Sequence, residues 1–166
     1  MKKTLPVIVT ALALSTSSYA QQPITKEALT GSWKVLNLKA TTGDKLTYPL
    51  GDKVGGYVTI TPTRMWLLFV DGTRKAPAAP TLTDAEAIEM MKSQVAWTGK
   101  YTMGEQTADG VKLSAHVDAA SSQAIFNTDR VYFVRMEDNK AIFTGKVIVP
   151  MTGVTSTVVF EMVKSD

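Results

Sequence analysis

The sequence predicts an all-β protein, an eight-stranded up-and-down antiparallel β-barrel with one short helix inserted after the third strand. Segments of strand length recur from residue 32 to residue 164, and short turn-forming stretches separate most of them. Apolar residues recur every second residue in these segments. After the third strand, one segment instead has the period of about 3.6 residues that is typical of a helix. Several strands are apolar on both faces, which is typical of a sheet that closes around an interior.

The first twenty residues are predicted to be a secretory signal peptide. Two lysines precede the apolar run Leu5–Leu14, and residues 18–20, Ser-Tyr-Ala, provide the small residues of a cleavage site. The run is too short for a lasting membrane span, although an N-terminal anchor is the alternative. We therefore expect cleavage after Ala20, a single domain over residues 21–166, and a periplasmic or secreted location in a bacterium.

Composition excludes several classes of function. The chain has 18 basic and 15 acidic residues, and removal of Lys2 and Lys3 leaves 16 basic residues and a net charge of +1. No basic patch indicates a nucleic-acid partner. The chain has no cysteine, which excludes disulfides, thiol chemistry and a lipid anchor on a cysteine after the apolar run. The domain must be held together by core packing alone.

The first elements are a short helical lead-in and a strand. Ile24–Thr30 has a possible N-cap, Thr25, and reads as one or two helical turns. Ser32–Thr41 follows as the first strand. Strict alternation would place Trp33, Val35 and Asn37 on one face and Leu36 and Leu38 on the other.

A loop and two strands follow. The stretch Thr42–Lys53 contains glycines and a proline and is predicted to be a loop. Val54–Thr61 is the second strand, and the Gly-Gly pair at its start indicates a bend or bulge. Arg64–Val70 is the third strand.

The inserted helix has a clear N-terminal signal. Thr83 and Glu86 form the ends of a capping box, and apolar residues then recur on one helical face. We predict a helix over Asp84–Gln94 that covers part of the outside of the barrel or one of its mouths.

Five further strands complete the predicted barrel, most of them joined by connections of hairpin length. They are Ala96–Met103, Val111–Asp118, Thr128–Met136, Ala141–Val149 and Val154–Lys164.

Several motifs, in this order, resemble those of a bacterial lipocalin-like domain family, a branch of the calycin barrels. They are Leu29-Thr30-Gly31-Ser32-Trp33, Thr63-Arg64-Met65, Asp71-Gly72-Thr73-Arg74, Trp97-Thr98-Gly99-Lys100-Tyr101 and Asp129-Arg130-Val131-Tyr132. The resemblance covers nearly all of Leu29–Val163 and implies an up-and-down barrel that carries a small apolar molecule. The chain departs from better-known secreted lipocalins in having no disulfide and in carrying arginine at the third position of a Thr-Asp-Tyr-like motif.

The resemblance also assigns a structural role to Trp33. In lipocalin-type barrels the indole near the start of the first strand closes one end, and a late arginine stacks on it. Arg130 and Arg135 are the possible partners here, and they point to opposite faces of their strand because their separation is odd. We favour Arg130, which lies in the family-like motif.

A ligand in the lumen would meet aromatic walls and a few polar groups. The predicted lumen residues are Trp66, Trp97, Tyr101 and Tyr132, with His116 or Arg64 as a polar anchor. The alternative is that these aromatic side chains simply fill the barrel.

His116 is the single histidine of the chain. It shares a strand face with Asp118, two residues away, so that an acid–base pair is conceivable. A hydrogen-bonded structural histidine and a ligand contact are the alternatives. No further residues group around it as metal ligands, and motifs of nucleophilic or phosphate-binding sites are absent from the sequence.

Three functions follow from this sequence. The first is an exported barrel that binds or carries a small hydrophobic or amphipathic ligand without chemistry of its own and without a cofactor. The second is an enzyme of isomerase or cyclase type that uses His116. The third is an envelope protein-interaction module with a filled barrel.

Overall fold

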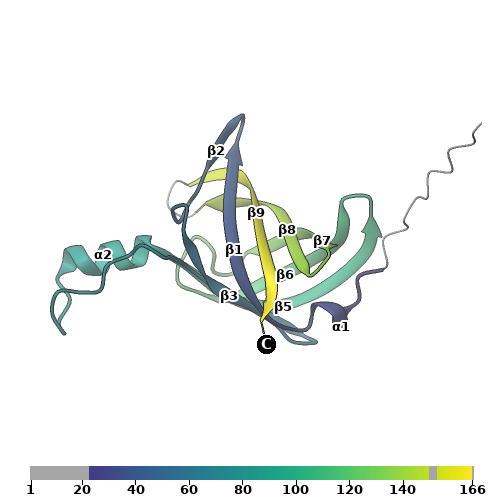
Figure 1. Cartoon of the computed structure of the whole chain (residues 1–166), viewed down its shortest axis with the longest axis horizontal. Coiled ribbons are helices and arrows are strands. Elements are labelled where there is room, and N and C mark those ends of the chain that lie inside the picture. The colour runs from purple at the N-terminus through teal and green to yellow at the C-terminus, as the bar shows by residue number, and fades with distance from the viewer. Residues whose placement is uncertain (1–22, 150–152, 166) are drawn as a thin grey trace, which may run out of the picture.

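Residues 23–149 and 153–165 are described by the computed structural model, and the predicted signal peptide, residues 1–20, lies outside them (Figure 1). The described strands are β1 (Gly31–Thr42), β2 (Lys45–Thr47), β3 (Val54–Ile60), β4 (Arg64–Asp71), β5 (Gln94–Thr107), β6 (Gly110–Ala120), β7 (Asp129–Glu137), β8 (Lys140–Val149) and β9 (Val154–Ser165). The helices are α1 (Lys26–Leu29) and α2 (Asp84–Lys92).

The predicted eight-stranded antiparallel barrel is confirmed. The strands pair in the order β1-β3-β4-β5-β6-β7-β8-β9, and β9 pairs back with β1 from Ser32↔Ser165 to Thr41↔Thr157. A closed sheet leaves no unpaired barrel edge. The ninth strand, β2, was predicted as loop; it forms a short hairpin with the end of β1 through Gly43, whose φ of 57° suits a tight turn.

A bulge in β1 changes which residues face the interior. The pairing register with β9 shifts between Val35 and Asn37, so that one extra residue is accommodated. As a result, the inward series Trp33 and Val35 continues with Leu38, while Leu36 is exposed. The predicted placement of Leu38 on the face opposite Trp33 is therefore wrong, because strict alternation does not survive a bulge.

The Gly-Gly pair, predicted to mark a bend or bulge in the second predicted strand, lies at the start of β3. Gly56 has φ of +130°, and a Cβ atom there would lie 1.9 Å from the carbonyl oxygen of Leu68 on β4. The pairing of β3 with β4 continues through Gly56 without a register shift, so the pair forms no bulge. The glycine is thus required for a close approach of two strands.

One end of the barrel is closed around Trp33. Thr25 caps α1 by accepting a hydrogen bond from the amide of Ala28, and α1 then presents the carbonyl of Leu29 to the indole N–H of Trp33 at 2.8 Å. Trp33 is fully buried. The cation over its ring is Lys164, at 5.5 Å from the centroid, and not Arg130 as predicted.

Helix α2 begins with the predicted capping box. Thr83 Oγ1 accepts a hydrogen bond from the amide of Glu86, and the Glu86 carboxylate accepts one from the amide of Thr83. The helix ends at Lys92, two residues earlier than predicted. None of its residues is buried, and Figure 1 shows it extending to one side of the barrel. The prediction that this helix covers part of the outside of the barrel or one of its mouths is therefore wrong.

We expect Trp33→Ala to lower the free energy of unfolding by about 3–5 kcal/mol, because it removes a large buried side chain and leaves a cavity at the closed end. The matched control is Trp66→Ala, since Trp66 is 52% exposed on the outer face of β4. Urea unfolding measures both. Equal losses in the two variants would contradict a closing role for Trp33.

Candidate ligand pocket

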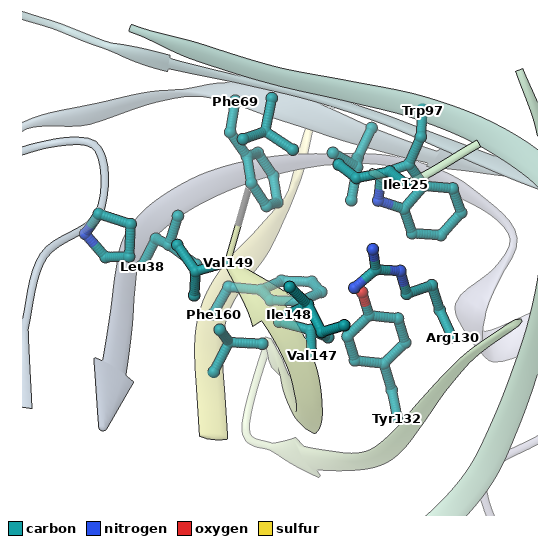
Figure 2. A pocket seen from close by; sticks show the side chains of 14 residues that line it. Leu38, Phe69, Trp97, Ile125, Arg130, Tyr132, Val147, Ile148, Val149 and Phe160 are labelled. Atoms are coloured by element: carbon teal, nitrogen blue, oxygen red, sulfur yellow. The ribbon is translucent and has the colours of Figure 1, made fainter. Parts of the chain in front are cut away.

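A partly open cavity of about 70 Å³ lies inside the barrel, farther along β1 than Trp33 (Figure 2). Its walls come from six strands, β1, β4, β5, β7, β8 and β9, and from two loops. The lining residues are Leu38, Pro49, Leu67, Phe69, Val95, Trp97, Ile125, Arg130, Tyr132, Val147, Ile148, Val149, Val158 and Phe160. All but Arg130 and the polar tips of Trp97 and Tyr132 present carbon to the cavity.

The cavity is small because aromatic rings fill the rest of the lumen. Phe160 packs against Phe143 at 5.0 Å and against Phe69 at 5.3 Å between ring centroids, and Tyr132 meets both Phe143 and Phe160 edge-on. A cavity that holds benzene has about 150 Å³. The pocket therefore admits only part of a ligand unless its walls move.

The polar groups lie together at one end of the pocket. In Figure 2 the side chains of Arg130 and Tyr132 lie side by side near Trp97, while Leu38 and Val149 lie at the opposite end. The Trp97 and Tyr132 rings are nearly parallel, with centroids 6.5 Å apart. Burial raises the pKa of Tyr132 to about 12, although the nearby charge of Arg130 acts in the opposite direction. The phenol is thus a neutral hydrogen-bond donor at physiological pH.

Strand alternation explains why Arg130 is inside. Arg130, Tyr132 and Val134 are the buried residues of β7, each separated by two positions. Arg135, on the other face, is exposed and forms an ion pair with Glu137. The sequence already contained this signal, because Arg130 precedes a predicted lumen tyrosine by two residues.

The predicted lumen residues divide into three groups. Trp97 and Tyr132 line the pocket. Tyr101 is buried but lies near the closed end, where its hydroxyl donates to the carbonyl of Thr61 at 2.9 Å. Trp66 and Arg64 lie on the outer face of β4 and therefore do not face the lumen.

His116 also lies outside. Its Nδ1 is 2.8 Å from Asp129 Oδ1, and more than half of its side chain is exposed. Asp118 is hydrogen-bonded instead by Arg64, which holds the pKa of that carboxyl below its usual value. The conceivable acid–base pair of His116 with Asp118 is therefore not formed, and His116 is instead an exposed strand histidine in contact with Asp129.

Two further properties bear on the site. Within residues 23–149 and 153–165, no group of three or more histidine or acidic side chains is placed to hold a metal ion. Across the same residues, none of the helices has the length and apolar character needed to cross a membrane.

The family comparison agrees with the barrel and its interior. Residues 30–160 match the model of the lipocalin-like domain. The chain belongs to the lipocalin-like domain family. No curated protein and no solved structure gives a match. Barrels of lipocalin-like fold generally bind small hydrophobic ligands, so the fold is suited to ligand binding or carriage.

We expect Tyr132 to ionise only at about pH 12 in the folded protein, and its phenolate absorbance to be missing from Tyr132→Phe. A buried phenol favours its protonated form, so its contribution to stability is complete below pH 10 and is lost as pH rises to 12. The loss is about 3 kcal/mol for a difference of about two pKa units. Unfolding titrations at rising pH test this, and an equal loss in Tyr132→Phe would contradict it.

Proposed function

We propose that this protein binds a small apolar or amphipathic molecule in the pocket of its barrel and carries it without chemistry of its own. The observation that supports the proposal is a partly open cavity walled almost entirely by carbon, with its hydrogen-bonding groups at one end. Small-molecule sites are commonly built in this way, from apolar walls and a few placed polar groups.

The size of the cavity shapes the proposal. About 70 Å³ accommodates a few heavy atoms, so the remainder of a ligand must lie outside the enclosed part of this partly open cavity. Chains or single rings that enter end-on suit this shape better than bulky polycyclic molecules. Displacement of lining side chains would admit a longer part of the ligand.

The proposed site can be blocked by a single substitution. We expect octanoate and octanol, titrated against a Trp66→Phe background, to change the emission of Trp97 and to raise the melting temperature. Leu38→Phe should abolish both effects, because the larger ring occupies the cavity. Leu36→Phe is the matched control, since Leu36 lies on the outer face of the same strand.

Failure of both probes with the Trp66→Phe protein and with its Leu36→Phe variant would contradict ligand binding. Docking on another envelope protein would then take its place. The observation that favours docking is a group of exposed apolar side chains on the outer faces of β3 and β4: Tyr57, Trp66 and Leu68. Tyr57 and Leu68 are paired directly across the two strands.

We further propose that the protein acts outside the cytoplasm, because residues 1–20 have the composition of a signal peptide. N-terminal sequencing of the protein from a periplasmic fraction should begin at Gln21. Recovery of soluble protein that retains Met1 only in the cytoplasm would refute export.

A further inference from the structure

In the described part of the chain, Arg130 is the one buried charged residue, with 6% of its surface exposed. It enters the lumen from β7, and its cross-strand neighbour on β6 is Ala115, which has no polar side chain. Figure 2 shows its guanidinium directed into the pocket, next to the hydroxyl end of Tyr132.

Among residues 23–149 and 153–165, the guanidinium has no hydrogen-bond or ion-pair partner. Its Nε is buried without a hydrogen bond. Its two terminal nitrogens are not fully buried, and they lie at the lining of the partly open pocket. An arginine stays protonated in any protein environment. Burial of a charge without a partner is strongly unfavourable, and native proteins normally supply a partner.

A structural role does not account for this arginine. The closing interaction that the sequence suggested for it, stacking on Trp33, is made by Lys164 at 5.5 Å. The other ring with a cation over it, Tyr101, is approached by Lys26. The described part of the chain thus gives this buried cation no hydrogen bond, ion pair or stacked ring that would offset its burial.

The neighbours of Arg130 define the ligand chemistry. A guanidinium and a protonated phenol are both hydrogen-bond donors toward the cavity, so together they favour an acceptor that carries negative charge. The planar fork of arginine matches the paired oxygens of a carboxylate, as it does those of a phosphate. At the opposite end Leu38 and Val149 offer only apolar surface.

We propose that the pocket selects a monoanionic amphiphile, whose carboxylate meets Arg130 and Tyr132 and whose apolar part points toward Leu38 and Val149. The inference rests on the proposed function, because it names the class of ligand for the same cavity. The carboxylate of the ligand is the negatively charged partner of Arg130, which has none among the described residues.

The test compares three probes of equal chain length, octanoate, octanol and octylamine, by isothermal titration calorimetry. Wild-type protein should bind octanoate about tenfold or more tightly than octanol, as expected for charge-assisted hydrogen bonds at a buried site. Octylamine should bind least, because its ammonium group is repelled by Arg130.

Arg130→Met should remove the preference, so that octanoate binds no better than octanol. Arg130→Lys should retain part of it, because the charge remains but the planar fork is lost. The matched control is Arg135→Met on the outer face of the same strand, which should leave the preference unchanged. Melting of the unliganded Arg130→Met protein should be no lower than that of wild type, since the substitution removes an uncompensated buried charge.

Equal binding of octanoate and octanol by wild type, or an unchanged preference in Arg130→Met, would overturn the inference while leaving the proposed function intact. Absence of binding by all three probes would overturn the proposed function itself. If Arg130→Met does not fold, the wild-type preference and the partial preference of Arg130→Lys decide the question.

Discussion

Closure of the sheet between β1 and β9 is the constraint on which the rest of this structure depends. The long antiparallel ladder from Ser32↔Ser165 to Thr41↔Thr157 removes the two sheet edges and creates an interior. Because the chain has no cysteine, this ladder and the packing inside it hold the barrel closed without a disulfide. Trp33 at the closed end and Leu38 in the pocket wall are both residues of β1, and the ladder holds this strand in place.

Packing and binding compete for the same interior. The rings of Phe69, Phe143 and Phe160 stabilise the barrel by filling it, and what remains is a cavity of about 70 Å³. Arg130 lines that remainder, and its Nε is buried there without a hydrogen bond. A charge kept there at a cost to stability is most simply understood as a part of function.

Much of the fold could be predicted from the sequence, because hydrophobic alternation and turn residues are local signals. The capping box at Thr83 is such a signal, and it fixed the start of α2 correctly. The site was harder to predict. The bulge after Val35 changes which residues of β1 point inward, and no local sequence pattern predicts it. Which face of β4 and β6 points inward also depends on the closed sheet, so Trp66 and His116 were placed in a lumen that they do not face.

Arg130 shows how a correct pattern can receive the wrong interpretation. Its inward direction follows from its spacing to Tyr132, yet the resemblance to lipocalin-type barrels assigned it to Trp33. The structure gives that position to Lys164, which the C-terminal end of β9 brings beside β1. Which cation lies over Trp33 depends on how β9 pairs with β1 when the barrel closes. The residue pattern within one strand does not predict that pairing.

The most direct test of the account is native mass spectrometry of the protein purified gently from its own host cells. The account predicts a population heavier than the bare chain by the mass of one small molecule, and that molecule, once released, should be detected as an acid. Detection of bare protein alone, together with a crystal structure in which side chains close the cavity beside Arg130, would contradict the account.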